Sequence, residues 1–324
     1  MGRGLGMRVF VAGAAGAIGR QLLPQLRAQG HSVTAATRTP GKLALLRELG
    51  AEPVAMDGLD AMAVGEAVAR AEPDAVIHQM TALAAGTDLR HFDTTFAVTN
   101  RLRTAGTDHL LAAAAAAGVR RFIAQSYTGW PNIRTGSRVK TEDEPLDPHP
   151  PAAQRESLAA ISRLERTVLA ATTLHPIVLR YGSLYGPGAS GELISMIRKR
   201  RVPVIGDGAG IWSFLHVHDA ASATVSALND GEPGVYNVVD DDPASVAEWL
   251  PFLARAVGAK PPRRVPVWLG RLAAGRVGVS MMTQIRGSSN AKAKRSLGWQ
   301  PAWPSWRQGF AGGLAESEPA RRTT

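Results

Sequence analysis

The chain of 324 residues contains no cysteine and no long apolar run. The missing cysteines exclude disulfides, thiolate metal sites and cysteine nucleophiles. No stretch approaches the roughly 18 apolar residues that a membrane-spanning helix needs. The opening MGRGLGMRVF also lacks the continuous apolar segment of a secretory signal. We therefore expect a cytoplasmic protein without a membrane partner.

Acidic residues are too few to balance the basic ones, and the formal net charge is +10. Three short clusters contribute to the excess, IRKRR at 197–201, PPRR at 261–264 and AKAKR at 291–295. They are separated in the sequence and are not interleaved with aromatic residues. This pattern is typical of solvated basic faces rather than of nucleic-acid recognition. We expect no nucleic-acid partner.

The sequence contains segments that alternate between strand and helix patterns. An apolar strand at 7–12 is followed by a glycine turn and an amphipathic helix with Ile18, Leu22 and Leu26 on one face. The strand SVTAAT completes a βαβ unit of about 30 residues. The later segments EPVAM, DAVIHQM, RRFIAQS and HPIVLRY repeat the alternation, which predicts an α/β fold with a parallel sheet.

The turn GAAGAIG places Gly13, Gly16 and Gly19 between the first strand and the first helix. Glycines at this spacing allow a tight turn, let the backbone approach a pyrophosphate, and let the helix pack closely on the strand. The phosphates would then lie at the positive end of the helix. In this context the pattern predicts a dinucleotide site.

The residue after the second strand is Arg38, where NAD-preferring sites carry an acidic residue. A guanidinium can pair with a 2′-phosphate, so NADP is the preferred cofactor. The alternative is that Arg38 is an exposed loop charge and that NAD is accepted. Asp57 follows the third strand and could meet the adenine, although it or Asp60 could instead cap a helix.

These segments, with LRYGSLYGPG, SFLHVHDAASATVSAL and NAKAKRSLGWQPAWPSWRQGF, resemble the extended short-chain dehydrogenase/reductase superfamily, the epimerase-like NAD(P)-dependent oxidoreductases. The likeness covers nearly the whole chain. It implies an α/β Rossmann fold, a doubly wound parallel sheet with a smaller discontinuous C-terminal substrate domain. The expected boundaries are 7–186 and 211–240 for the Rossmann domain, 187–210 and 241–312 for the substrate domain, and 1–6 and 313–324 for flexible termini.

The resemblance also implies the cofactor contacts, which would surround the pyrophosphate, the adenosine and the nicotinamide in turn. One departure is Arg103, which stands where the family often has asparagine. The implied cofactor-binding residues are Gly13, Ala15, Gly16, Ala17, Ile18, Arg38, Asp57, Gln79, Met80, Thr81, Tyr181, Gly182 and Ser183.

The family's chemistry uses a serine, a tyrosine and a lysine four residues after the tyrosine. Ser126 matches the serine. When the helix is aligned on Glu165, the tyrosine position holds Ser157 and the lysine position holds Ile161. A serine is a poor proton donor near neutral pH, and isoleucine carries no charge. The usual acid/base pair is therefore missing.

Two explanations of this loss remain open. Another hydroxyl could act as the acid, and Tyr127, Tyr181 and Tyr185 are candidates, so the predicted catalytic residues are Ser126, Tyr127 and Tyr181. The preferred function is then hydride transfer between a nicotinamide and a small organic carbonyl or alcohol. Alternatively, the protein is a non-redox NADP-binding sensor, or an isomerase, epimerase or lyase that uses the same pocket.

Other features receive simpler interpretations. The segment 127–156 follows Ser126 and is expected to cover the nicotinamide, with Trp130 contacting the substrate. His216 and His218 lack a third ligand, so we expect no metal site. The alanine-rich helix near residue 112 and the helix at Ser157 could pair in a homodimer, as they often do in the resembled family. Three tryptophans are expected to fasten the C-terminal segment, namely Trp299, Trp303 and Trp306.

Overall fold

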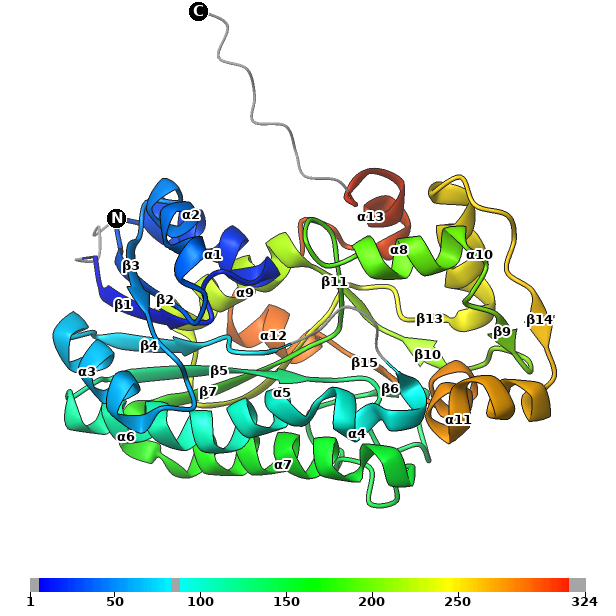
Figure 1. Ribbon diagram of the computed structural model, residues 1–324, viewed down its shortest axis with the longest axis horizontal. Coiled ribbons are helices and arrows are strands. Elements are labelled where there is room, and N and C mark those ends of the chain that lie inside the picture. Colours follow the sequence, from blue (N-terminus) through cyan, green and yellow to red (C-terminus); the bar gives the residue numbers. More distant parts are fainter. Residues whose placement is uncertain (1–5, 83–87, 315–324) are drawn as a thin grey trace, which may run out of the picture.

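The computed structural model describes residues 6–82 and 88–314, and its centre is a seven-stranded parallel sheet (Figure 1). The strands are β1 (Arg8–Ala12), β2 (Ser32–Thr37), β3 (Glu52–Ala55), β4 (Ala75–His78), β5 (Arg121–Tyr127), β7 (Pro176–Tyr181) and β12 (Gly234–Val238). Their order across the sheet is β3, β2, β1, β4, β5, β7, β12. The direction of winding reverses between β1 and β4, where doubly wound folds bind ligands.

Helices cover both faces of this sheet (Figure 1). The first helix shows why, because its buried residues Ile18, Leu22 and Leu26 recur at helical spacing and point toward the strands. Most of the remaining helices that pack on the sheet have similar apolar stripes, as the sequence predicts. The helices that cover the sheet, together with the short helices next to them in the chain, are α1 (Ala17–Ala28), α2 (Leu43–Glu48), α3 (Ala61–Ala71), α4 (Phe92–Thr95), α5 (Ala97–Arg101), α6 (Thr107–Ala116), α7 (Arg155–Ala170), α9 (Val217–Asp230) and α12 (Ala291–Ser296).

A smaller group of elements, here called the distal part, extends beyond the carboxyl ends of the strands. Its own apolar core is built around Phe214, Trp249 and Trp306. It consists of β8 (Ser183–Tyr185), α8 (Gly191–Arg198), β9 (Val204–Ile205), β10 (Ile211–Trp212), β11 (Phe214–His216), β13 (Ala244–Ser245), α10 (Val246–Ala256), β14 (Arg264–Val265), α11 (Val267–Thr283), β15 (Gly287–Ser288) and α13 (Trp306–Gly312).

One expected domain boundary is wrong. Ala293, Leu297 and Trp299 belong to the apolar cluster that covers the sheet, not to the core of the distal part. The indole of Trp299 also donates a hydrogen bond to the Ser222 hydroxyl on α9, at 2.9 Å. The segment 291–299 therefore belongs with the Rossmann sheet, although the sequence interpretation assigned it to the substrate domain. The sequence predicts flexible termini at 1–6 and 313–324, and most of these residues lie outside the described part of the chain.

The segment that follows β5 is attached to the distal part. Its short strand β6 (Val139–Lys140) pairs with β15. The Asn132 amide nitrogen donates hydrogen bonds to the Gly287 carbonyl and to the Ser288 hydroxyl. These contacts hold the segment over the carboxyl end of the sheet. The sequence predicts that this segment covers the nicotinamide. None of the helices described here is long and apolar enough to cross a membrane.

A buried ion pair and one further hydrogen bond join the strands β5 and β7 to the helix α7. The guanidinium of Arg180 on β7 donates two hydrogen bonds to the Glu165 carboxylate on α7, at 2.8 and 2.6 Å. Ser126 on β5 donates a third, at 2.7 Å. All three side chains are buried. The carboxylate therefore fixes the position of α7 relative to two neighbouring strands.

We predict that Arg180→Met lowers the free energy of unfolding by about 3–5 kcal/mol, because it leaves the Glu165 carboxylate buried without its cation. Urea denaturation followed by circular dichroism measures the change. Arg163→Met is the matched control on α7, because Arg163 pairs with Asp108 at the exposed surface. That control should cost at most about 1 kcal/mol. Equal losses for the two variants would contradict the role assigned to the buried pair.

Candidate active site

A cavity of about 1520 Å³ runs along the carboxyl ends of the central strands and continues into the distal part. One half is lined by the glycine turn after β1 and by the residues that follow β2, β3 and β4. The other half is lined by α8, β9 and α11. Both halves belong to one cavity, which Tyr127 also lines. A ligand that occupies the first half therefore adjoins a ligand in the second.

The glycine turn has the geometry of a phosphate cradle. Gly13 has φ +87°, and a Cβ there would lie 2.6 Å from the Gln79 carbonyl oxygen. A Cβ on Gly19 would lie 2.0 Å from the Ala14 carbonyl oxygen, so glycine is required for α1 to pack on the turn. Gly16 begins α1 without a side-chain cap. The first backbone N–H groups of the helix are therefore available to an anion.

Charged groups follow β2 and β3 at the rim of the same half. Arg38 is exposed and lines the cavity together with Lys42. Asp57 lines it from the next strand and accepts a hydrogen bond from the Leu59 amide. Asp60, not Asp57, caps α3. The cations fit a ribose phosphate, and Asp57 is free of the capping role. The donor set therefore suits a phosphorylated dinucleotide.

Most of the residues predicted from the sequence meet at this cavity. Those that line it are Gly13, Ala15, Gly16, Ala17, Arg38, Asp57, Gln79, Met80, Thr81, Tyr127 and Ser183. Four predicted residues are not among its lining residues, namely Ile18, Ser126, Tyr181 and Gly182. Ile18 is buried in the core beneath α1. Gly182 lies tightly against the backbone of Ser213.

The positions of Ser126 and Tyr181 correct the predicted catalytic set. Ser126 points away from the cavity and donates its hydroxyl hydrogen to Glu165. Tyr181 is fully buried, and its hydroxyl bonds Thr224 and the Gln79 amide. Burial raises the pKa of Tyr181 to about 12. Both hydroxyls are used within the core. Ser126 faces the side of the sheet opposite to Tyr127, because consecutive residues of a strand alternate. Tyr181 pairs in register with Tyr127, but its hydroxyl bonds Thr224 on α9.

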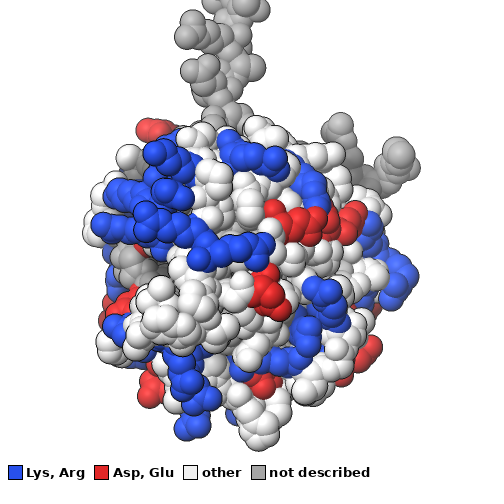
Figure 2. All heavy atoms as spheres, turned by 90° about the vertical axis from the view of Figure 1, so that its right-hand side faces the viewer, with Lys and Arg blue, Asp and Glu red and all other residues white. Residues whose placement is uncertain are grey.

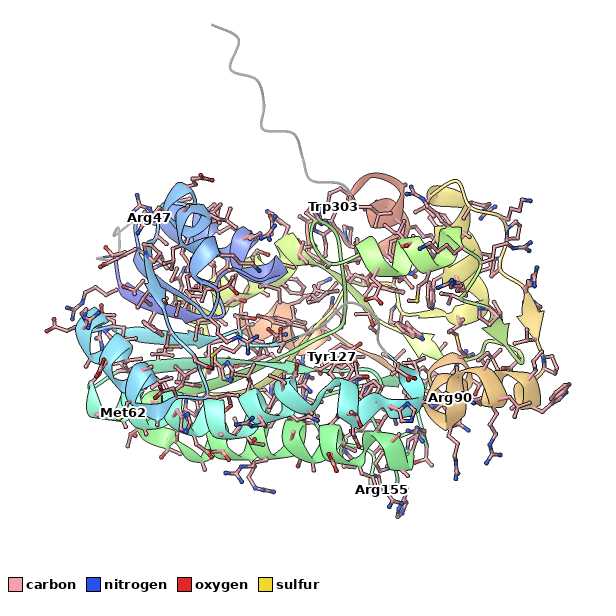
Figure 3. The ribbon with its side chains drawn as sticks, viewed as in Figure 1. Arg47, Met62, Arg90, Tyr127, Arg155 and Trp303 are labelled. Atoms are coloured by element: carbon pink, nitrogen blue, oxygen red, sulfur yellow. The ribbon has the colours of Figure 1, made fainter. Side chains whose placement is uncertain are left out.

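Tyr127 is the member of the predicted catalytic set that lines the cavity, and Tyr185, the third candidate tyrosine, lines it from β8. Figure 3 shows Tyr127 near the centre of the molecule, between the sheet and the distal part. Its hydroxyl lies 3.0 Å from the Ser183 hydroxyl, which lines the cavity as well. Burial raises the pKa of Tyr127, and the Ser183 hydrogen bond and the positive charge of Arg103 partly offset this increase. Tyr127 therefore remains protonated at neutral pH.

Arg103 is the functional candidate that the sequence interpretation missed. It lies in a π-helical turn, Leu102–Gly106, between α5 and α6, and its side chain lines the cavity. Burial lowers the pKa of Arg103 to about 10, although nearby Tyr127 opposes the shift. Single π-helical turns occur frequently at functional sites. The sequence showed that Arg103 replaces an asparagine common in the family. It did not indicate that Arg103 lies close to Tyr127.

The two positions that lost the family's tyrosine and lysine have a structural role. Ser157 is fully buried, donates its hydroxyl hydrogen to Asp93 at 2.6 Å, and accepts a hydrogen bond from Asn100 at 3.0 Å. Ile161 is also fully buried, in an apolar cluster with Phe92 and Trp130. Neither residue lines the cavity. This part of α7 therefore presents no side chain to the cavity that could transfer a proton.

Aromatic side chains form one wall of the second half. Trp130 lines the cavity, as predicted, with its ring centroid 6.3 Å from that of Tyr127. Phe92 lies against Trp130 in an edge-on contact and stacks on Phe96, with centroids 4.4 Å apart. Such a wall suits a flat, apolar substrate placed beside the Tyr127 hydroxyl.

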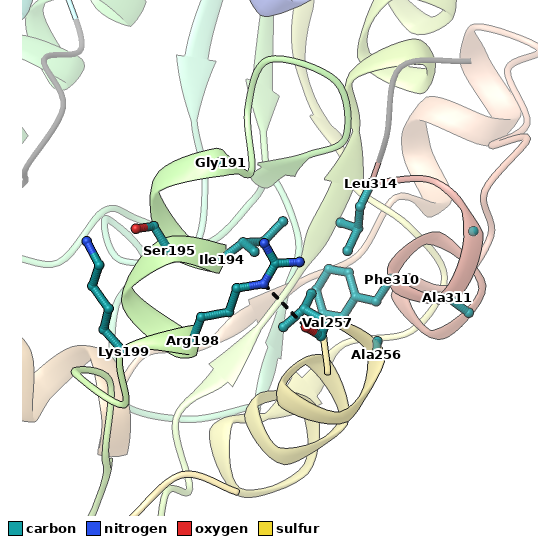
Figure 4. Close-up of a pocket in the computed structure, with 11 residues that line it drawn as sticks. Gly191, Ile194, Ser195, Arg198, Lys199, Ala256, Val257, Phe310, Ala311 and Leu314 are labelled. Carbon is teal, nitrogen blue, oxygen red and sulfur yellow. Dashed lines mark hydrogen bonds between the residues drawn. The ribbon is translucent and has the colours of Figure 1, made fainter. Parts of the chain in front are cut away.

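A second cavity of about 600 Å³ lies between α8, α10 and α13 (Figure 4). Arg198 and Lys199 stand at its edge, and Phe310 and Leu314 line it. It contains neither the glycine turn nor Tyr127. His216 bonds the Gly313 carbonyl, and the described residues contain no group of three His, Cys, Asp or Glu side chains that could hold a metal ion.

Known proteins resemble this chain in sequence and in structure. Residues 9–238 match the model of the NAD dependent epimerase/dehydratase family. A 3-diazoavenalumate denitrifying reductase from a Streptomyces species is 42% identical over 309 residues, which cover 94% of this chain and 99% of that protein.

Two solved structures have the same fold. UDP-glucose 4-epimerase of Thermotoga maritima, solved with UDP-glucose, has a TM-score of 0.75 at 22% identity and covers 94% of this chain and 97% of its own. A human epimerase family protein, solved with NADPH, has a TM-score of 0.72 at 21% identity and covers 94% and 98%. The chain belongs to the NAD dependent epimerase/dehydratase family, part of the extended short-chain dehydrogenase/reductase superfamily that its motifs resemble.

Proposed function

We propose that this protein is an NADP-dependent oxidoreductase that reduces a small, largely apolar organic carbonyl compound, with Tyr127 as the proton donor. One observation carries the proposal: Tyr127 lines the same cavity as the glycine turn and Arg38, and its hydroxyl bonds Ser183, which lines the cavity as well. NADPH bound there would supply the hydride, and NAD(H) remains an alternative cofactor. Solved structures of the same fold hold NADPH in one case and NAD in others, so the preference for NADP rests on Arg38.

The side chains around the cavity would perform the remaining steps. Trp130 and Phe92 would hold the substrate against the nicotinamide half and exclude water. Tyr127 would donate its proton to the substrate oxygen, and the hydrogen bond to Ser183 would orient its hydroxyl. Arg103 would act as a positioning residue, because its charge stabilises the phenolate that forms. It would thus replace the missing lysine.

The proposal also includes the cellular setting and the assembly. The absence of cysteine suits the cytoplasm. The α6 and α7 helices have exposed small residues, Ala112, Ala115 and Ala159, which would let a second copy approach closely. We therefore propose a homodimer through these helices, which light scattering can test. The division into a Rossmann domain and a substrate domain is likewise a proposal, with the corrected boundary at 291–299.

A second function is favoured by the loss of the tyrosine and lysine on α7. Replacing a diazonium group by hydrogen takes one hydride and releases dinitrogen, so no proton has to reach a developing alkoxide. The 42% identical relative is named as a denitrifying reductase of a diazo compound. An aryl diazonium and an aromatic aldehyde should be compared as substrates. A wild-type protein that reduces only the former, at a rate that Tyr127→Phe leaves unchanged, would establish the diazo function instead.

Replacing Tyr127 by Phe should lower kcat for carbonyl reduction by about 10²- to 10⁴-fold, because the proton donor is lost. The measurement is the loss of reduced-nicotinamide absorbance with a panel of aromatic aldehydes and ketones. Tyr181→Phe is the matched control, since its hydroxyl serves only the core contacts to Thr224 and Gln79. It should lower stability and keep kcat near the wild-type value. Full turnover by Tyr127→Phe would remove Tyr127 as the donor.

Arg103→Met should move the alkaline limb of carbonyl reduction to higher pH. The positive charge lowers the pKa of Tyr127, so its removal raises that pKa and extends the protonated form upward. Alcohol oxidation near pH 9 should become slower for the same reason. Arg103→Lys should keep the wild-type limb. A uniform loss of kcat with an unmoved limb would indicate that Arg103 only supports the structure.

Arg38→Asp should raise the Kd of NADPH about tenfold to hundredfold and leave that of NADH nearly unchanged, because only NADPH carries the 2′-phosphate. Titration calorimetry measures both constants. Arg47→Asp provides the matched control, because Arg47 is exposed on the neighbouring α2 and does not line the cavity (Figure 3). Equal effects of Arg38→Asp on both cofactors would contradict recognition of the 2′-phosphate.

A further inference from the structure

The first half of α11 exposes apolar side chains to solvent. Six large hydrophobic side chains are exposed among the described residues, and four of them are Val267, Trp268, Leu269 and Leu272. Trp268 is 65% exposed and Leu272 is 61% exposed. Isolated apolar residues on a surface need no explanation, but a contiguous group of this kind marks an interaction site.

This exposed half is separated from a buried half. The helix breaks at Gly275, which has φ +69°, and the Arg90 side chain donates a hydrogen bond to the freed carbonyl of Leu272 beside the break. Beyond the break, Val277 and Met281 are buried. Before it, Gly270 lies so close to Ile205 that a Cβ would come within 2.5 Å. The exposed half is therefore held firmly in place.

Helical spacing gives the exposed half two different faces. Trp268 and Leu272 are four residues apart, so they lie on one face, which is turned to solvent. Leu269 and Ala273 form the adjacent face and line the large cavity. One helix thus separates the substrate half of the cavity from the outside of the molecule.

Basic residues surround the exposed face. The exposed run 198–201 lies beside the exposed Arg263 and Arg264. Two hydrogen bonds hold the segments together: the Arg200 guanidinium donates one to the Pro261 carbonyl at 3.0 Å, and the Val204 amide donates one to the Arg263 carbonyl at 2.9 Å. Figure 2 shows this end of the molecule, where Lys and Arg outnumber Asp and Glu. The sequence interpretation treated these two clusters as separate, and the fold brings them together.

The stretch of sequence that contains α11 carries no negative charge, although the acidic residues Asp88 and Asp207 lie near this helix in space. Between Glu248 and Glu316 the sequence contains no acidic residue and eleven basic ones. Arg271 lies within the exposed half of α11 itself and is exposed. An apolar face with a tryptophan, flanked by arginines, is the composition of a segment that lies in the interface of an anionic membrane.

We propose that this surface, formed by residues 198–201 and 260–272, docks on an anionic lipid bilayer. Trp268 and Leu272 would enter the headgroup region, and the surrounding arginines would pair with lipid phosphates. Aliphatic side chains such as Leu272 and Val267 have no role in stacking on nucleic-acid bases, which favours lipid over nucleic acid. The proposal revises the expectation that the protein has no membrane partner, which rested on the absence of spanning segments and a secretory signal.

Docking in this way would place the substrate half of the cavity next to the bilayer. Leu269 is both at the exposed surface and at the cavity wall. An apolar substrate dissolved in the membrane could then reach the cavity past the first half of α11. This consequence depends on the proposed function, whereas the docking itself does not.

Co-sedimentation of the full chain with vesicles tests the docking. Binding should be strong to phosphatidylcholine mixed with phosphatidylglycerol, weak to phosphatidylcholine alone, and reduced by added salt. Trp268→Ser combined with Leu272→Ser should weaken binding at least about tenfold. Arg263→Gln combined with Arg264→Gln should weaken it about 25-fold, since each charge near the surface contributes about fivefold. The sites are exposed, so the variants should fold.

Met62→Ser is the matched control for the apolar substitution. Met62 is 76% exposed on α3, at the end of the molecule opposite α11 (Figure 3). This variant should bind vesicles like the wild type. Three results would overturn the proposal: no preference for anionic vesicles, a concentration-dependent dimer that the Trp268 and Leu272 substitutions abolish, or binding to duplex DNA that the arginine substitutions abolish while vesicle binding persists.

Discussion

The buried carboxylate of Glu165 is the contact on which the arrangement of the candidate site depends. It accepts hydrogen bonds from β5 through Ser126 and from β7 through Arg180, and it lies on α7. Because side chains alternate along a strand, holding Ser126 on this side turns the next residue, Tyr127, to the cavity. A carboxylate that does not line the cavity thus influences which hydroxyl faces it.

The same alternation explains how the fold accommodates the changes on α7. Under the proposed function, Tyr127 lies between cofactor and substrate, so a second tyrosine from the helix is not required there. Ser157 and Ile161 instead complete the packing against Asp93, Phe92 and Trp130. The cation of the proposed site comes from the π-helical turn that carries Arg103, not from α7. A tyrosine and a cation still adjoin each other, but they come from different elements.

Local patterns in the sequence placed Gly13, Gly16 and Arg38, which line the first half of the cavity, although their contacts with a cofactor stay predictions. A turn between a strand and a helix constrains its residues by short-range sterics and charge. Ser126 and Tyr181 were misplaced for a different reason. A strand buried on both faces shows no apolar alternation, so the sequence does not reveal which side chains face the cavity. β7 is buried at each of its six residues.

Long-range packing accounts for the other features that the sequence did not reveal. Arg103 acquires a role only because a π-helical turn directs it toward Tyr127, and no spacing rule predicts that turn. The basic runs at 198–201 and 261–264 are some 60 residues apart in the chain, yet β9 and β14 pair and bring them together. The segment 291–299 returns to the Rossmann sheet for a similar reason, since Trp299 fits against α9.

The electrostatics of Tyr127 favour one direction of the proposed reaction. A phenol whose pKa is raised by burial stays protonated at neutral pH, so it can give a proton to an oxygen that gains negative charge. The reverse reaction needs the phenolate, which burial disfavours. Arg103 stabilises the phenolate once it has formed, but the net shift of the pKa is still upward. The site is therefore better suited to reduction than to oxidation, in agreement with a tyrosine that has no lysine beside it on the helix.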